Sequence, residues 1–275
     1  MERVIINNVK YNNNYCEEGI KVGTEGHRHY KYNYLTNVIF RLDFPEIKLN
    51  QTPPWNFIND LKEQFPIHDK IQGQSLELQI KDFKHTTRSE DIVSWEFKDR
   101  RNEKRVVIDS NSLVFEHLKY RGFEDFYDNI KFIIDKVGSH YSLENINRLG
   151  LRYINQIDIK PPKKPLNWTG LIKKELTCLS DNFINDKNNI SRSMQFLEMN
   201  GEDYRLRFQF GMYNSEYPNI ISKKEFVLDY DCVTITSIGL GDVVNTTKNF
   251  HEIIYNWYEM SIDDKLRGMM SDEEE

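Results

Sequence analysis

Asp229 and Asp231 are the acidic residues whose spacing is best suited to chemistry. They lie two residues apart in a run of strand-forming residues, so both carboxylates project from one face. Such a pair could hold a divalent cation and serve a metal-dependent hydrolase, with Glu198 and Glu225 as further ligands. Alternatively, either aspartate could neutralise Arg152, which lies in another expected strand. We favour the ion pair, because two acids alone do not make a metal site.

Histidines provide a second possible ligand set. His27 and His29 place two imidazoles on one face of an extended segment, which is half of a zinc site. Only Cys16 precedes them, and no second ligand pair follows at zinc spacing, so we expect a solvated loop. His251 begins the last expected helix, where Tyr255 replaces the second histidine of a metalloprotease motif. We therefore predict that the protein has no metal and no cofactor.

Basic residues gather in two expected hairpins. Arg100 and Arg101 lie in the turn of the first, whereas Arg205 and Arg207 alternate with aromatic residues in the second. Basic and aromatic residues interleaved on a sheet suit single-stranded nucleic acid. Acidic residues are mixed into both hairpins, which favours solvated turns instead. Nucleic-acid binding is therefore possible but not the favoured interpretation.

Composition narrows the class of protein. The chain has 275 residues, 39% of them hydrophobic, which is enough for a substantial core. Its net charge is −6, of which the acidic tail at 271–275 contributes −4, so the body carries only −2. The three cysteines form no CxxC pair, and no apolar run could span a membrane or serve as a signal peptide. We expect a cytoplasmic protein that binds no membrane.

Motifs for common enzyme classes are missing from the sequence. It contains no GxxxxGK[ST], GxGxxG or GxSxG pattern. An enzymatic activity therefore stays uncertain, and a non-enzymatic role is favoured.

The segment 148–159 is the strand around which the chain is expected to be organised. Tyr153 and Asn155 share one face with leucines and isoleucines, while Arg152 lies on the other. Large side chains on both faces predict a central strand covered on both sides. Arg152 must then find a carboxylate partner or line a groove.

The order of expected elements is similar in two parts of the chain. Each part reads as strand, helix, three or four strands and helix, which suggests an internal duplication. The predicted fold class is α+β: two tandem β-α-β(3–4)-α halves form a curved antiparallel sheet with helices packed on one face, as in the TATA-binding protein. The predicted domains are an N-terminal arm or hairpin at 1–34, halves at 35–145 and 146–270, and the tail at 271–275.

Several short motifs together resemble a sporadically distributed bacterial protein family that has no assigned activity. The resemblance implies the fold and a link to mobile or anti-phage gene clusters, and it implies no catalytic residues. It covers roughly residues 37–270. The motifs are Phe40-Arg41-Leu42-Asp43-Phe44-Pro45, Phe65-Pro66-Ile67, Arg148-x-Gly-Leu-Arg-Tyr-Ile-Asn155, Leu228-Asp229-Tyr230-Asp231 and Phe250-His251.

These observations favour a non-enzymatic binding or regulatory subunit. We expect it to engage a protein partner encoded nearby, in a hetero-complex that serves bacterial anti-phage defence. A nucleic-acid-sensing module and a hydrolase centred on Asp229 and Asp231 are the alternatives. The candidate binding residues are Arg152, Tyr153, Asn155, Asp229, Asp231, Arg100, Arg101, Arg205 and Arg207.

Overall fold

A computed structural model describes residues 27–28, 30–49, 54–81, 84–182 and 189–271. Its main feature is one antiparallel sheet of nine strands, in the order β2-β3-β4-β5-β1-β7-β10-β9-β8. The strands are β1 (Leu35–Asp43), β2 (Ile67–Lys81), β3 (Lys84–Lys98), β4 (Lys104–Ile108), β5 (Ser112–His117), β7 (Arg148–Ile159), β8 (Ser193–Asn200), β9 (Tyr204–Met212) and β10 (Lys224–Thr234). A separate small sheet joins β6 (Asn145–Ile146) to β11 (Ile238–Gly239).

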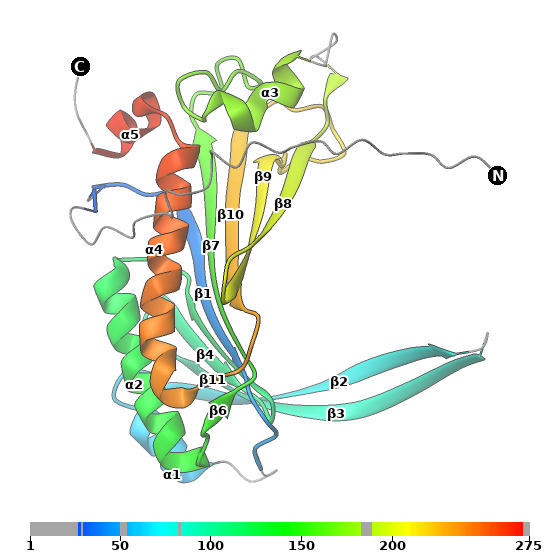
Figure 1. The fold of residues 1–275 in the computed structure, drawn as a ribbon, viewed down its shortest axis with the longest axis vertical. Helices are drawn as coiled ribbons and strands as arrows, with labels where there is room; N and C mark the ends of the chain where they lie inside the picture. The colour runs from blue at the N-terminus through cyan, green and yellow to red at the C-terminus, as the bar shows by residue number, and fades with distance from the viewer. Residues whose placement is uncertain (1–26, 29, 50–53, 82–83, 183–188, 272–275) are drawn as a thin grey trace, which may run out of the picture.

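The helices are grouped unevenly around this sheet (Figure 1). Helix α4 packs against β7 and β10, and α2 packs between α1 and α4, so these three helices cover one face. Helix α3 lies instead beyond the ends of the strands, where it contacts β9. The helices are α1 (Trp55–Leu61), α2 (Phe123–Tyr141), α3 (Lys174–Asn182), α4 (Val243–Ser261) and α5 (Asp264–Ser271).

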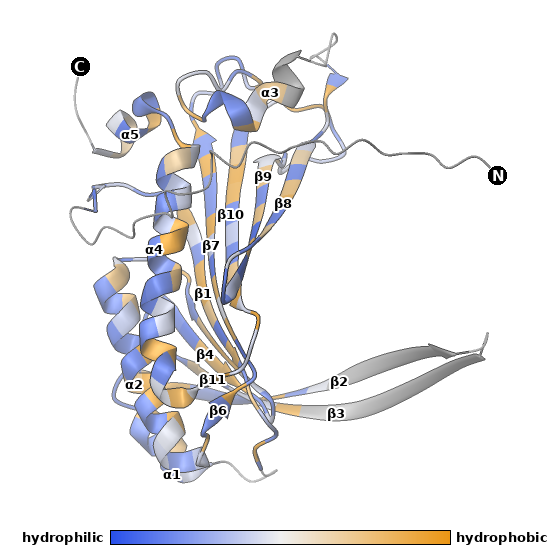
Figure 2. Ribbon diagram, viewed as in Figure 1, coloured by the Kyte–Doolittle hydropathy of each residue, from blue (hydrophilic) through white to orange (hydrophobic). Residues whose placement is uncertain are grey.

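Hydrophobic alternation explains why one face of β7 is buried. Its residues from Leu149 to Ile157 at every second position are all buried under α4. The same alternation of apolar and polar residues is visible along β9 and β10 (Figure 2). Phe208 of β9 stacks on Tyr230 of β10, with ring centroids 4.5 Å apart. These side chains form the core between the sheet and α4.

Helix α2 follows its sequence pattern closely. Gly122 precedes it with a φ of 137°, a conformation that favours glycine. Glu124 and Asp125 in its first turn interact favourably with the helix dipole. Its apolar face is buried, and the helix ends at Ser142 in a left-handed conformation. The buried side chains on that face are Phe126, Ile130, Ile133, Ile134 and Val137.

Strands β2 and β3 form a long hairpin that projects away from the sheet (Figure 1). Their backbones pair from Ile67 with Lys98 to Lys81 with Lys84. Only the base of β3, from Trp95 to Lys98, also pairs with β4. The sequence pattern predicts strands only at 75–83 and 92–98. The observed strands are longer, because the polar residues at 67–74 and 84–91 also adopt an extended conformation.

The predicted fold class is wrong. The structure is mostly one large antiparallel sheet and not two tandem halves; α1, α2 and α4 lie on one face of this sheet, but α3 lies beyond the ends of its strands. At the centre of this sheet, β1 pairs with β7. The spacing of Trp168, Ile172, Leu176 and Leu179 predicts a helix that begins at Trp168, but α3 begins at Lys174 and Trp168 lies in the loop before it. Similar local patterns predicted the elements but could not predict how strands and helices are arranged.

None of the helices in the described part of the chain combines the length and apolar character needed to cross a membrane. The expected arm at 1–34 is described only from His27 onward, apart from His29, and the tail only at Ser271.

Candidate functional site

The sheet face opposite α1, α2 and α4 is called here the open face, because none of the described helices covers it. The strand register aligns charged residues across it. Asp231 of β10 lies between Arg152 of β7 and Arg207 of β9, and Arg207 lies opposite Glu198 of β8. Positive and negative side chains therefore alternate across four neighbouring strands. The expectation that β7 is covered on both faces by packed elements is not met within the described residues.

The predicted ion pair of Arg152 is present, and its partner is Asp229. Nε and Nη2 of Arg152 donate to the two carboxylate oxygens of Asp229 at 2.8 and 2.6 Å. Asp229 is only 8% exposed, so the guanidinium covers the carboxylate. Burial raises the pKa of Asp231, although Arg148, Arg152 and Arg207 oppose that shift. The ion pair of Arg152 with Asp229 therefore links β7 to β10.

The four acids considered as metal ligands do not come together. Both oxygens of Asp229 are bound by Arg152, and Glu198 accepts a hydrogen bond from Arg207 at 3.0 Å. Glu225 is hydrogen-bonded to the backbone and hydroxyl of Ser215, both at 2.8 Å. This geometry weighs against a hydrolase centred on the two aspartates.

A similar arrangement lies on the other side of the open face. Arg105 of β4 donates two hydrogen bonds to Glu116 of β5, at 3.0 and 2.6 Å, and reaches Glu96 of β3 at 3.4 Å. Glu96 and Glu116 are each 8% exposed. This network was not predicted from the sequence, because the partners of Arg105 come from the strands on either side of it.

The two basic clusters are far apart. Arg100 and Arg101 are exposed in the turn between β3 and β4, and their side chains make no ion pair among the described residues. Arg205 donates to Asn200 at 3.0 Å in the β8–β9 hairpin. Strands β4 and β9 are five positions apart in the sheet, which is roughly 24 Å at ordinary strand spacing. The clusters therefore do not form one basic surface.

Tyr153 and Asn155 lie on the opposite face of β7, under the helices. The hydroxyl of Tyr153 lies 2.9 Å from Nδ1 of His251, and Nδ2 of Asn155 donates to the carbonyl oxygen of Leu228 at 3.3 Å. Both side chains line a pocket of about 720 Å³ between the segment before β1, the start of α2, and α4. Other residues that line this pocket, called here the aromatic pocket, include His27, Tyr120, Phe123, Glu252 and Tyr255.

Two histidines give the aromatic pocket its chemical character. Nε2 of His27 lies 2.7 Å from Oε2 of Glu252, and its ring stacks on Tyr255 with centroids 4.0 Å apart. The ring of His251 stacks on Phe123 at 3.6 Å. Burial, with a contribution from the charge of His27, lowers the pKa of His251 to about 3. His251 is therefore neutral at physiological pH and able to act as a ligand or a hydrogen-bond acceptor.

Sequence reasoning did not find this group of residues. His27 was paired with His29, which lies outside the described residues, and His251 was expected to cap or face a helix. His27 and Glu252 are 225 positions apart, so no motif spacing joins them. The one local signal was the adjacent pair His251-Glu252 at the helix expected to close the chain.

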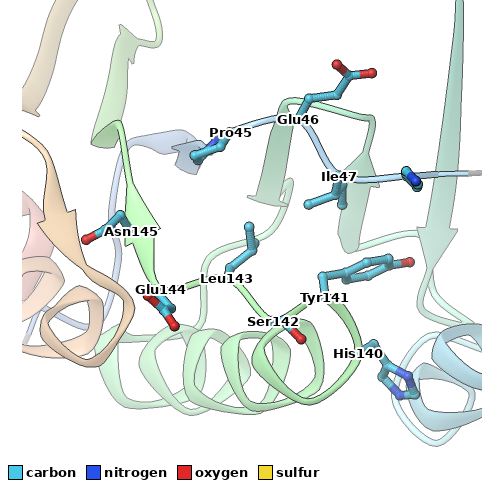
Figure 3. Close-up of a pocket in the computed structure, with 10 residues that line it drawn as sticks. Pro45, Glu46, Ile47, His140, Tyr141, Ser142, Leu143, Glu144 and Asn145 are labelled. Atoms are coloured by element: carbon cyan, nitrogen blue, oxygen red, sulfur yellow. The ribbon is translucent and has the colours of Figure 1, made fainter.

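A second pocket, of about 610 Å³, lies at the end of α2 (Figure 3). It is bounded by the segment after β1, which includes Glu46 and Ile47, and by the turn from His140 to Asn145. Nε2 of His140 is already paired with Asp60 at 2.9 Å. Within the described residues, this pocket brings together no cluster of three metal-ligating side chains.

No protein-family model matches this sequence, and no curated protein matches it. The candidate site is therefore assigned from its geometry alone.

Proposed function

We propose that the protein is a non-enzymatic binding subunit that docks a protein partner on the open face. The observation that carries this proposal is that arginines form the outer layer of that face over buried or half-buried acids. The side chain of Arg152 is 43% exposed above an Asp229 side chain that is 11% exposed. Arg105 is 40% exposed above Glu116, at 10%. Each guanidinium is held in a fixed orientation by the acid beneath it.

Fixed arginines suit a protein interface. A guanidinium has five N–H donors, so an arginine that is paired with one carboxylate still has donors and a flat face for a partner. Arginine is also enriched at protein–protein interfaces and at their energetic hot spots. Because the orientation is already set, binding costs less side-chain entropy than it would for free arginines.

The balance of charge favours a protein over nucleic acid. The arginines of the open face are matched by acids on the same face, so few positive charges are available to neutralise phosphates. Nucleic-acid affinity depends mainly on such uncompensated charges. A protein partner whose surface carries both positive and negative charges complements the open face better than nucleic acid does.

Phe196 supplies an apolar anchor on the same face. It lies two residues before Glu198 on β8, so both side chains project to the open face. Phe196 is 63% exposed. An exposed aromatic ring beside oriented arginines is the usual composition of an interface hot spot.

The setting in bacterial anti-phage defence is part of the proposal and is supported only by the resemblance of the sequence motifs. The neighbouring genes are therefore the first source of partners to test. The full chain is co-expressed with each neighbouring gene product, and complexes are measured by size-exclusion chromatography with light scattering.

A photo-crosslinking amino acid placed at position 196 locates the interface. We expect a crosslink to the partner from position 196 and none from position 131, an exposed position on α2. Phe196→Asp and Arg207→Glu should weaken the complex at least 10-fold, whereas Lys131→Glu should leave it unchanged. Equal crosslinking from both positions, or a complex insensitive to both open-face variants, would place the interface elsewhere. Failure of every neighbour to bind would contradict the proposal itself.

Nucleic-acid sensing by the β3–β4 turn is the second candidate, favoured by the exposed and unpaired state of Arg100 and Arg101 among the described residues. It predicts binding to single-stranded DNA or RNA that weakens steeply with salt. Replacement of both arginines by Gln should abolish that binding. Binding that is insensitive to salt or to the replacement excludes this candidate.

A further inference from the structure

We infer that His27, His251 and Glu252 form a binding site for a divalent transition metal ion of the zinc class. One ligand atom from each residue lies within 4.8 Å of the others. His27 comes from the segment before β1, and His251 and Glu252 come from neighbouring positions on α4. Two imidazoles with one carboxylate are a ligand set that zinc and related ions prefer over calcium or magnesium.

The distances are close to those that a bound ion requires. Two ligand atoms on the same zinc ion, with bonds of about 2.0–2.1 Å, lie roughly 3.3 Å apart. Nε2 of His27 and Oε2 of Glu252 are 2.7 Å apart, so they need to separate by only about half an ångström. The ligand atom of His251 lies within 4.8 Å of both, so it must approach them by up to about 1.5 Å. The ion would replace the proton shared by His27 and Glu252, which moves to Nδ1 of His27 or to solvent.

A contact with Tyr153 orients His251. Nδ1 of His251 lies 2.9 Å from the hydroxyl oxygen of Tyr153, and a hydroxyl oxygen can accept a hydrogen bond as well as donate one. With its proton on Nδ1, His251 keeps a free lone pair on Nε2. Metal-binding histidines are commonly oriented by this kind of hydrogen bond from the second ring nitrogen.

Aromatic rings fix both imidazoles before any ion binds. His251 stacks on Phe123 with an interplanar angle of 5°, and His27 stacks on Tyr255 at 19°. The side chain of Glu252 is only 8% exposed, so few water molecules compete with a metal ion for its carboxylate. The rings therefore restrict the rotation of both imidazoles, which lowers the conformational entropy lost when the ligands adjust to an ion.

The site leaves room for an exchangeable ligand. Three protein ligands leave the fourth position of a tetrahedral zinc ion open. All three ligand residues line the aromatic pocket of about 720 Å³, which Arg28 and Lys248 also line. A water molecule or a small anion could serve as the fourth ligand of the ion. This site lies on the helix side of the sheet, so it is independent of the docking proposed for the open face.

Zinc titration of the full-length protein tests the inference. The protein is stripped with EDTA, exchanged into metal-free buffer and titrated with ZnCl2 by calorimetry, and Co²⁺ absorption reports the coordination geometry. We expect one equivalent to bind, with a higher melting temperature on addition of zinc. His27→Gln and Glu252→Gln should each weaken binding about 100-fold and remove the zinc-dependent rise in melting temperature. The apo melting temperature shows whether each variant still folds.

His140→Gln is the matched control, because His140 also pairs with a carboxylate, that of Asp60 at 2.9 Å, but lies in no cluster of three ligands among the described residues. Its zinc affinity should equal that of the unchanged protein. The inference is overturned if no saturable binding occurs at one equivalent. It is also overturned if His27→Gln, folded as judged by its apo melting temperature, binds zinc as tightly as the unchanged protein.

Discussion

Arg152 binds Asp229 diagonally across the β7–β10 strand pair, although Asp231 is the residue directly opposite it in the register. In this diagonal pairing, Nε and Nη2 of Arg152 each donate a hydrogen bond to one carboxylate oxygen of Asp229. Asp231 is left between Arg152 and Arg207, where burial raises its pKa. The two aspartates, which look equivalent in the sequence, thus have different surroundings in the structure.

Arg152→Ala should lower the free energy of unfolding by about 1–3 kcal/mol, because it leaves the Asp229 carboxylate, 8% exposed, without its partner. Urea denaturation at pH 7 measures the change. Lys131→Ala is the control, since the pair of Lys131 with Asp128 is exposed and should contribute less than about 0.5 kcal/mol. Similar losses in the two variants would show that the Arg152 pair has no special structural role.

His117 should make the protein less stable as the pH falls from about 6.5 toward about 4. The side chain is fully buried, and neither ring nitrogen has a hydrogen-bond partner. Burial, helped by Lys104, lowers the pKa of His117 to about 4. In this range the unfolded chain binds a proton that the folded protein excludes, so stability present above pH 6.5 is lost progressively below it.

His117→Phe should remove this contribution, because Phe fits among Phe115 and Phe126, whose rings pack on His117. Urea denaturation between pH 7 and 4 should give a stability curve that is flatter than that of the unchanged protein by up to about 1.4 kcal/mol per pH unit. Parallel curves for the two proteins would mean that His117 titrates equally in the folded and unfolded states.

Gly211→Ala should destabilise the β8–β9 pair strongly. Gly211 has a φ of 139°, and an added Cβ would lie 2.0 Å from the carbonyl oxygen of Ser193. The strand must shift to relieve this contact, so we expect a loss of more than about 2 kcal/mol in thermal or urea unfolding. Gly268→Ala in α5 is the control, because its Cβ meets no atom within 4 Å and alanine favours a helix. That variant should be as stable as the unchanged protein or more so.

Asn214 should organise the loop between β9 and β10. Its side-chain amide donates to the carbonyl oxygens of Ser191 and Asn219, at 2.9 and 2.7 Å, and its φ is 55°. Asn214→Gly removes the hydrogen bonds but keeps the backbone relaxed, whereas Asn214→Ala adds backbone strain. Both should lower the melting temperature, and the alanine variant should be less stable than the glycine variant by about 1 kcal/mol. Equal stability of the two would show that the left-handed conformation costs nothing here.

Elements with strong hydrophobic periodicity were predictable from the sequence. The strand at 148–159 occurs as expected. The apolar residues from Phe123 to Val137, whose spacing in the sequence predicts an amphipathic helix, form the buried face of α2. The polar hairpin of β2 and β3 has no such pattern, and its length was underestimated. The predicted two-half arrangement was wrong, because periodicity says which face is buried but not which strand lies beside it.

The candidate sites were predictable only in part. The pairing of Arg152 with Asp229 or Asp231 was expected, since a central strand must neutralise a buried charge. The cluster of His27, His251 and Glu252 was not, because its members become neighbours only when the segment before β1 packs against α4. No spacing rule for local motifs applies across 225 residues.

The pairing of β1 with β7 has a consequence for how the polypeptide matures during translation. The ion pair at one end of this seam, Arg148 with Asp43, joins positions 105 residues apart. One edge of β1 therefore lacks its native partner strand until β7 has been synthesised and has left the ribosome. During that interval its backbone donors and acceptors are open to other nascent chains, and contacts of such large sequence separation form slowly. Chaperone protection should matter most while this middle portion is being synthesised.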